Sequence, residues 1–214
     1  MKKLIYVWAV MALLITSCGD DSTPEASFRS VHLVSDYFLP DTFESATYGK
    51  TFDGAYYLYF RVNGERVSSG ESSVGVPRHE LFDSISNLYH DYHWNGWNDC
   101  ETFVCAFPVT SISLVADVDY GEDMPAGCNL CDYLKVYVSS WGEFVLNNYP
   151  NDMEHLQHVE KLFSDFTEKE KSLWSNGSIE IILPQSVPLM PHNVTFTISF
   201  EGGKTLTKML RVEL

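Results

Sequence analysis

Residues 194–214 read VTFTISFEGGKTLTKMLRVEL, and this stretch decides the fold class. From Val194 to Phe200 every second side chain is apolar, and threonine or serine fills the positions between. Strict alternation is typical of a strand with one buried face, because successive strand side chains point to opposite sides. Two glycines in residues 201–204 favour a tight hairpin turn. The alternation then resumes through residues 206–214, with Lys208 as its one exception.

The same two-residue period recurs along the chain, which indicates a mainly β protein. A less regular strand is expected around residues 28–34, and the pair Asn63–Gly64 is expected to form a turn after the strand at residues 56–62. At least six short strands separated by turn residues favour a β-sandwich, with the immunoglobulin-like arrangement as one form of it. An up-and-down barrel is the alternative, because periodicity does not distinguish a closed sheet from two packed ones. The regular strands are predicted at residues 56–62, 112–118, 134–138, 179–183 and 194–200.

One or two short helical insertions are predicted between the strands. Residues 152–166 carry apolar side chains at the spacing of one helix face. Thr167 stands three residues before Glu170, which is typical of a capping box, and a second helix is expected from there through Trp174, ended by Asn176–Gly177. Residues 78–89, after Pro77, predict one or two further helical turns. The apolar positions concerned are Met153, Leu156, Val159, Phe163 and Phe166, and then Leu81, Ile85, Leu88 and Tyr89.

Composition places the chain among ordinary globular proteins. Of its 214 residues, 45% are hydrophobic and 20% are charged, so it has enough apolar side chains for a core without a metal or cofactor. Its formal net charge is −15. Such an acidic surface repels phosphate backbones, and this excludes nucleic acid as an expected partner.

The first 17 residues predict a secretory signal peptide. Lys2 and Lys3 are followed by an apolar run from Leu4 to Ile15 and then by small residues. A transmembrane helix is the alternative, but these 12 residues rise only about 18 Å, short of a bilayer core. We therefore expect export and removal of residues 1–17.

Residues 15–18, ITSC, resemble the lipobox of bacterial lipoproteins, in which the cysteine receives lipid. The acidic residues that follow, GDDS at 19–22, resemble the surface-export signal of Bacteroidetes-type outer-membrane lipoproteins. This resemblance implies that Cys18 is the lipidation site, carrying acyl chains such as palmitate, and that the protein faces outward from the outer membrane. Several acyl chains together anchor a domain stably. The expected organisation is a signal peptide (1–17), a lipidated cysteine with a flexible tether (18–27) and a single β-sandwich domain (28–214).

Residues 110–133 carry a second resemblance. An alternating strand at residues 110–115 is followed by acidic residues at 117–120, by Pro125-Ala126-Gly127, by Leu130 and by Tyr133. This order resembles a pattern in uncharacterised Bacteroidetes-type lipoproteins. The resemblance implies a small extracytoplasmic β-rich domain and supplies no catalytic residues.

Four cysteines remain in the predicted domain: Cys100, Cys105, Cys128 and Cys131. Their C-x4-C and C-x2-C spacing fits a zinc site, but an exported domain with an even number of cysteines favours disulfides. The sequence leaves all three possible pairings open. Each pair precedes a predicted strand, so pairing across the two motifs would join the starts of two strands.

Residues 90–99, HDYHWNGWND, form the most unusual local run. Tyr92, Trp94 and Trp97 are candidate ligand-binding residues, because aromatic rings beside Asn and Asp can stack on sugars and bond their hydroxyls. The alternative is a compact loop whose aromatic side chains pack on one another. His90 and His93 lack an acidic neighbour at ligand spacing that would complete a metal site.

Two further clusters have weaker chemical interpretations. His155 and His158 lie three apart on the predicted helix, without the H-E-x-x-H pattern of zinc proteases. Residues 117–123, DVDYGED, gather four carboxylates that could bind calcium, but the glycine stands one position earlier than an EF-hand loop requires. A solvated histidine pair and an acidic strand end are the favoured interpretations.

The sequence as a whole predicts a lipid-anchored binding or structural domain with a membrane and a glycan or protein as partners. No nucleophile elbow, phosphate-binding loop or nucleotide fingerprint occurs, so no catalytic residue, metal ligand or cofactor is assigned. One alternative is a glycan-acting hydrolase that uses a pair of carboxylates, whose separation is tertiary information. The other is a surface protein that binds calcium or zinc.

Overall fold

Nine strands and two helices make up the part of the chain that the computed structural model describes, namely residues 32–52, 54–68, 78–91, 103–151, 154 and 156–214. The strands are β1 (Asp36–Lys50), β2 (Tyr56–Ser68), β3 (Phe103–Cys105), β4 (Val109–Ala116), β5 (Val136–Ser140), β6 (Gln157–Lys161), β7 (Trp174–Ile182), β8 (His192–Phe200) and β9 (Thr205–Val212). The helices are α2 (Arg78–Leu88) and α3 (Gly142–Leu146), and two 3₁₀ turns are η2 (Leu130–Asp132) and η3 (Phe163–Asp165).

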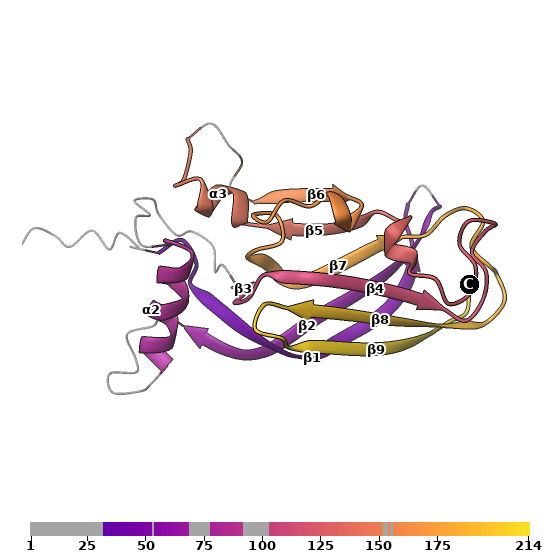
Figure 1. The fold of residues 1–214 in the computed structure, drawn as a ribbon, viewed down its shortest axis with the longest axis horizontal. Coiled ribbons are helices and arrows are strands. Elements are labelled where there is room, and N and C mark those ends of the chain that lie inside the picture. The colour runs from indigo at the N-terminus through magenta and orange to yellow at the C-terminus, as the bar shows by residue number, and fades with distance from the viewer. Residues whose placement is uncertain (1–31, 53, 69–77, 92–102, 152–153, 155) are drawn as a thin grey trace, which may run out of the picture.

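The strands form two sheets that pack face to face (Figure 1). The larger sheet has the order β2-β1-β3-β7-β5-β6, and the smaller one has the order β4-β8-β9. Phe60 of the larger sheet stacks on Phe196 of the smaller one, with ring centroids 4.2 Å apart. The inner faces of both sheets thus share one core, as the alternation of apolar residues predicts. The predicted mainly β, sandwich-like fold with two short helices is confirmed.

The hairpin β1–β2 crosses the larger sheet along its length. At its open end β1 pairs with β3 through Asp36–Phe38, whereas near its turn β2 pairs with β7 through Tyr57–Arg61. The crossing is closest at Gly177 of β7, where a Cβ would lie 2.1 Å from the carbonyl oxygen of Val62. Gly177 also has a φ of +63°, which favours glycine. The expectation that Asn176–Gly177 ends a helix is therefore wrong, because the pair forms a kink inside β7.

The pair Asn63–Gly64 also lies inside a strand, so the predicted turn there is wrong. β2 continues to Ser68, and Gly64 faces a register shift between Pro40 and Thr42 of β1. A Cβ on Gly64 would lie 1.7 Å from the carbonyl oxygen of Leu39. The glycine is needed for this close approach of two strands rather than for a chain reversal.

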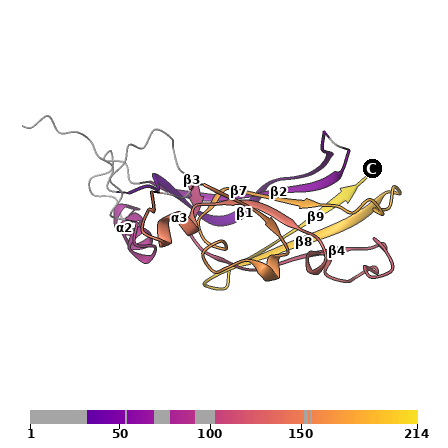
Figure 2. The same ribbon diagram turned by 90° about the horizontal axis from the view of Figure 1, so that it is seen from above.

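A second, smaller core lies on the outer side of the larger sheet, at one end of it. Tyr37 and Val104 point into this core, whereas their chain neighbours Phe38 and Cys105 point into the main core. Helix α2 contributes Phe82 and α3 contributes Phe144, among others. We call this end of the sandwich the helix end, and we call the opposite end, which carries the β1–β2 turn at residues 51–55, the turn end. Figure 2 shows both helices gathered at the helix end.

Most predicted strands are confirmed, with small shifts in their bounds. Predicted strands 112–118, 134–138, 179–183 and 194–200 correspond to β4, β5, β7 and β8, and the residues 201–204 turn joins β8 to β9 with a hydrogen bond from Phe200 N to Lys204 O. The predicted helix at residues 78–89 is α2, although Leu81 and Leu88 are exposed and Phe82 takes a buried place.

Two expected elements are wrong. The described part of the strand expected around residues 28–34 is not a strand: Leu33 and Val34 are buried outside any strand, and β1 begins at Asp36, while residues 28–31 lie outside the described residues. The helix predicted over residues 152–166 is instead β6 followed by η3, with residues 152, 153 and 155 outside the described residues. Its apolar spacing arises because a short edge strand buries Val159 and the turn after it packs Phe163 and Phe166 against Trp174.

The predicted capping box is present, but it closes a turn instead of opening a helix. Thr167 N donates to the Glu170 carboxylate at 2.7 Å, and Glu170 N donates to Thr167 Oγ1 at 3.1 Å. The chain then turns into β7 at Trp174, whose indole N–H donates to the Glu170 carbonyl at 2.7 Å. The sequence signal identified the local hydrogen bonds correctly and the following element wrongly.

Candidate functional site

The outer side of the larger sheet is open toward the turn end and carries three tyrosines. The strand register aligns Tyr59 of β2 with Glu180 of β7 and Tyr137 of β5 in one row across the sheet. Tyr57 lies one row nearer the turn end, and His158 of β6 pairs with Ser139 of β5 one row nearer the helix end. We call this surface the tyrosine face and define it by Tyr57, Tyr59, Tyr137, His158 and Glu180.

Alternation along each strand places these side chains outside. Leu58 and Phe60, on either side of Tyr59, are fully buried in the main core, and so are Ile179 and Ile181 on either side of Glu180. The side chains between them must therefore point away from the core. The tyrosines themselves are half-buried.

Two of the tyrosines are held in place by their neighbours. The Tyr57 side chain covers Gly49 on β1, where a Cβ would lie 2.6 Å from the tyrosine hydroxyl, so the missing side chain of Gly49 lets the ring lie on the backbone. The Tyr59 hydroxyl is hydrogen bonded to Ser178 Oγ at 2.9 Å. Both rings are thus fixed before any ligand arrives, which lowers the entropy cost of binding.

Tyr137 is fixed by His158 on the neighbouring edge strand. The two rings are nearly parallel, at 10° with centroids 5.9 Å apart, and His158 Nδ1 is hydrogen bonded to the Tyr137 hydroxyl at 3.0 Å and to Ser139 Oγ at 2.9 Å. The interpretation of His155 and His158 as a pair on one helix face is wrong, because His158 lies on strand β6, and His155 is outside the described residues.

Glu180 differs from the other charged groups nearby. Lys135 and Glu160 form an ion pair at 3.2 Å, and Arg61 pairs with Glu44 at 3.1 Å. The Glu180 side chain makes no hydrogen bond or ion pair with any described residue. Its carboxylate therefore stands half-buried between two tyrosines with all of its acceptor capacity free.

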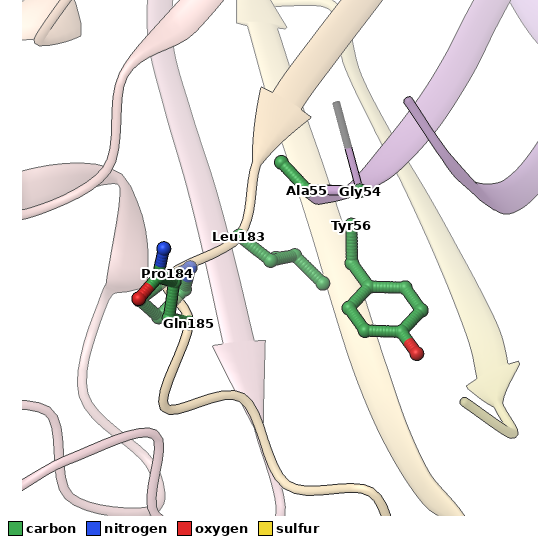
Figure 3. Close-up of a pocket in the computed structure, with 6 residues that line it drawn as sticks. All are labelled: Gly54, Ala55, Tyr56, Leu183, Pro184 and Gln185. Atoms are coloured by element: carbon green, nitrogen blue, oxygen red, sulfur yellow. The ribbon is translucent and has the colours of Figure 1, made fainter. Parts of the chain in front are cut away.

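The sandwich also has a small pocket at the turn end, drawn in Figure 3. Its volume is about 290 Å³, and it lies where β2 begins and β7 ends. Its lining residues Tyr56 and Leu183 are the chain neighbours of Tyr57 and Ile182, which lie on the outer side of the sheet. Among its described lining residues, Tyr56 and Gln185 supply the only polar side chains, and none is an acid or a histidine. These described side chains offer shape but no general acid or base. Its lining residues are Gly54, Ala55, Tyr56, Leu183, Pro184 and Gln185.

Several residues singled out in the sequence lie outside the described residues. They are Cys18, Tyr92, Trp94, Trp97 and Cys100. The structure does fix the point where the aromatic run departs, because Asp91 is fully buried.

Asp91 joins three parts of the chain. Its Oδ1 accepts hydrogen bonds from Leu33 N at 2.9 Å and from the Tyr149 hydroxyl at 2.6 Å, and its Oδ2 accepts one from Val34 N at 3.0 Å. Sequence reasoning counted this aspartate among the polar residues of a ligand loop. Its burial and its three donors instead make it a structural anchor for the helix end.

The three described cysteines are free thiols in the structure. Burial raises the pKa of Cys105 to about 12, and burial together with the nearby Asp132 carboxylate raises the pKa of Cys131 to about 12. Cys105 Sγ donates to Phe107 O before β4 begins, whereas Cys131 is bonded to the backbone at Leu114. Along β4, Val109 and Leu114 are about 17 Å apart, so Cys105, which precedes the start of β4, and Cys131, beside Leu114, lie toward different ends of that strand.

The acidic turn at residues 117–123 does not gather its carboxylates. Asp117 accepts hydrogen bonds from the backbone and side-chain N–H groups of Asn193, and these hold its pKa below the ordinary value. Asp119 accepts one from Ala126 N at 2.7 Å. Among the described residues, no group of three or more His, Cys, Asp or Glu side chains is arranged to hold a metal ion. These carboxylates therefore stabilise the conformation of the turn at the end of β4.

A buried tyrosine–histidine pair lies behind this turn, and no sequence motif indicates it. The Tyr120 hydroxyl and His192 Nε2 are 2.7 Å apart, and His192 Nδ1 is 2.8 Å from Met190 O. Burial, followed by the charge of Asp117, raises the pKa of Tyr120. Both side chains are almost fully buried, so the pair joins the loop after β7 to the acidic turn and is closed to ligands.

No protein-family model matches this chain, and no curated protein or solved structure is similar enough to match it either. None of the helices in the described ranges is long and apolar enough to cross a membrane. The features of this protein that bear on its function are therefore the geometry of the tyrosine face and the N-terminal sequence.

The signal that would have found the tyrosine face was present in the sequence. Tyr57, Tyr59, Tyr137 and Glu180 occupy the outward positions of strands that the alternation predicts correctly. Their proximity could not be predicted, because it depends on β2, β7 and β5 being neighbours in that order.

Proposed function

We propose that this protein is a lipid-anchored, non-catalytic binding domain on the outer surface of the outer membrane. Cys18 carries the acyl chains, and the tyrosine face holds the ligand. The leader and the lipobox-like residues 15–18 support the anchor. The observation that carries the binding role is the row of Tyr59, Glu180 and Tyr137, in which an unpaired carboxylate lies between two oriented rings on an open sheet.

The hydrolase alternative has less support. Glu160 and Glu180 flank Tyr137 in the same row, but Glu160 is exposed and its carboxylate is held by Lys135. A glycosidase needs one carboxylic acid in an enclosure that raises its pKa, facing a second carboxylate across the scissile bond. The pocket in Figure 3 contains neither group. A calcium- or zinc-binding role has no described cluster of ligands in its favour.

The anchor is tested by expressing the full chain and a Cys18→Ser variant in an outer-membrane host fed with labelled palmitate. The wild-type chain should carry the label and enter the detergent phase, and protease added to intact cells should remove it. The serine variant should lose both the label and the detergent partitioning. A Cys18→Ser chain that kept both properties would contradict lipid anchoring, and a labelled chain resistant to protease on intact cells would contradict surface exposure.

A further inference from the structure

The tyrosine face is nearly neutral although the chain as a whole is strongly acidic. Its surrounding charges cancel as the ion pairs Arg61–Glu44 and Lys135–Glu160, and Glu180 alone remains. The formal charge of the whole chain is −15. An anionic polymer would therefore be repelled at long range and would find no cation free on this face. A neutral ligand is not repelled.

Hydroxyl groups supply most of the polarity of this face. The Tyr59 hydroxyl is bonded to the Ser178 hydroxyl, and His158 Nδ1 joins the hydroxyls of Tyr137 and Ser139. Such groups donate and accept hydrogen bonds equally well, as the hydroxyls of a sugar do. The aromatic faces meanwhile offer apolar area for the C–H side of a sugar ring.

The spacing of the two aligned tyrosines suits an extended ligand. Tyr59 and Tyr137 lie on strands that flank β7, so their backbones are about 10 Å apart, two strand spacings. Both strand positions face the same way, so one chain laid across β2, β7 and β5 reaches both rings. A compact monosaccharide would reach only one of them.

Glu180 lies between these two rings, and its carboxylate favours a ligand that carries hydroxyl groups. A carboxylate accepts hydrogen bonds from two neighbouring hydroxyls at once, and such charge-assisted bonds are stronger than neutral ones. Since no described residue uses this capacity, it is available to a ligand that lies between the rings.

From these observations we propose that the tyrosine face binds a chain of neutral sugars, stacked on Tyr59 and Tyr137 and hydrogen bonded through its hydroxyls to Glu180. This assignment depends on the proposed binding role and names its ligand class.

The full chain, purified in detergent, is titrated in a calorimeter with neutral xylan, mannan, laminarin and starch, and with polygalacturonate as the acidic counterpart. At least one neutral polysaccharide should bind and polygalacturonate should not. Tyr59→Ala and Tyr137→Ala should each weaken binding about tenfold, because each removes one stacking ring. Tyr133→Ala is the matched control, since Tyr133 is a half-exposed tyrosine directly after η2 and precedes strand β5, which carries Tyr137. Its affinity should equal that of the wild-type chain.

A second pair of variants distinguishes the contribution of the Glu180 carboxylate to binding from that of the Glu160 carboxylate. Glu180→Gln should weaken binding several-fold, whereas Glu160→Gln should not, because the Glu160 carboxylate is already paired with Lys135. Glu180→Gln, Glu160→Gln and Tyr133→Ala should leave the melting temperature nearly unchanged. Tyr59→Ala and Tyr137→Ala should lower it but keep one cooperative transition above the assay temperature, which shows that lost binding is not lost folding.

The possible failures are distinguishable from a failure of the proposed function. No binding to any neutral polysaccharide, or tighter binding to polygalacturonate, would overturn the ligand class and leave the anchoring test unaffected. Binding that survives both tyrosine substitutions would overturn the site while keeping the binding role. A dimer in gel filtration that Tyr59→Ala and Tyr137→Ala abolish would show that a second copy of the chain occupies this face, and it would overturn the proposal.

Discussion

At the scale of single residues, Asp91 is a buried carboxylate that joins three parts of the chain. It is fully buried, and its carboxylate accepts hydrogen bonds from two backbone N–H groups and from Tyr149. Removing the carboxylate leaves all three donors without their acceptor. A buried donor without an acceptor costs more free energy than an ordinary hydrogen bond contributes to stability. We expect Asp91→Ala to lower the free energy of unfolding by about 3 kcal/mol, measured by urea denaturation.

Tyr149→Phe is the matched control for Asp91. It removes one of the three donors and leaves the carboxylate and its two backbone partners in place, so its cost should be about 1 kcal/mol. Equal effects of the two substitutions, or a loss below about 0.5 kcal/mol in Asp91→Ala, would show that Asp91 does not anchor the helix end.

Asp36 gives the protein a pH dependence whose direction follows from its partners. Burial alone would raise its pKa, but hydrogen bonds from Arg66 at 2.7 and 2.5 Å and from Ser68, together with the Arg66 charge, hold the pKa below the ordinary value of 3.8. The folded state therefore prefers the ionised form. This contribution to stability is complete above pH 3.8 and is lost as the pH falls through the lowered folded pKa.

The measurement is the free energy of unfolding at neutral pH and near pH 3 for the wild-type chain and for Asp36→Asn. Wild type should be the more stable at neutral pH, and the difference between the two should shrink on acidification. Taking the difference between the two chains cancels the pH dependence that comes from the other carboxylates, because these titrate in both chains. A difference that stays constant over this range would contradict the assigned role of Asp36.

At the scale of elements, the crossing of the β1–β2 hairpin over β7 depends on Gly177. A Cβ at this position meets the Val62 carbonyl oxygen at 2.1 Å, and the backbone φ is positive. Gly202 also has a positive φ, but a Cβ there meets nothing within 4 Å. Gly202→Ala should thus cost only the backbone strain, about 1 kcal/mol, whereas Gly177→Ala should cost at least about 3 kcal/mol because strands must also separate. Similar melting temperatures for the two variants would contradict the close crossing.

The cysteines are also best considered at this scale, because the strands decide which can meet. Cys105 and the Cys128–Cys131 turn lie toward opposite ends of β4, and Figure 1 shows η2 near the far end of that strand from β3. Both pairings across the two motifs require Cys105 to join Cys128 or Cys131, so both are disfavoured.

If the exported protein is fully oxidised, we therefore expect the bonds Cys100–Cys105 and Cys128–Cys131. Proteolysis without reduction, followed by mass spectrometry of the linked peptides, identifies the partners. Trypsin alone cannot separate the two motifs, because no Lys or Arg lies between Cys105 and Lys135. A second protease that cuts at acidic residues such as Glu122 is therefore needed. A linked peptide that joins Cys105 to Cys128 or Cys131 would contradict the strand arrangement.

The elements that the sequence predicts well are those with a continuous buried face. In β8 the residues Val194, Phe196, Ile198 and Phe200 are all buried, so burial and alternation coincide. Strand β6 buries only Val159 and ends in a turn, so its apolar residues matched a helical period by combining two elements. The tyrosine face was likewise beyond periodicity, which assigns Tyr59 and Tyr137 to the outside but does not make them neighbours.

At the scale of the whole molecule, the sandwich has two unlike ends. At the helix end α2 and α3 cover the outer side of the larger sheet and bury a second core. Toward the turn end the same side of the sheet is left open, and there the tyrosine face lies. His32, the first described residue, contacts Phe82 of α2 with ring centroids 5.3 Å apart. The chain therefore enters the domain at the helix end. The turn end is the end that lies farther from the N-terminal attachment.

This polarity makes a prediction about how the domain stands on a membrane. Cys18 precedes His32 by only 14 residues, so the proposed lipid anchor is attached to the domain at the helix end. The β8–β9 turn at residues 201–204 lies at the helix end, because Lys204 pairs with Asp41 at 3.5 Å, and the residues 51–55 turn lies about 30 Å further along β1.

A donor dye placed on a short tag between Gly202 and Gly203 should therefore transfer more energy to acceptor-labelled lipid headgroups than the same tag in the 51–55 turn. Wild-type chains in liposomes give the comparison, and Cys18→Ser chains, which lack the proposed anchor, should show little transfer from either position. Equal or reversed transfer in the anchored protein would contradict an outward-facing turn end and would bring the tyrosine face toward the lipid.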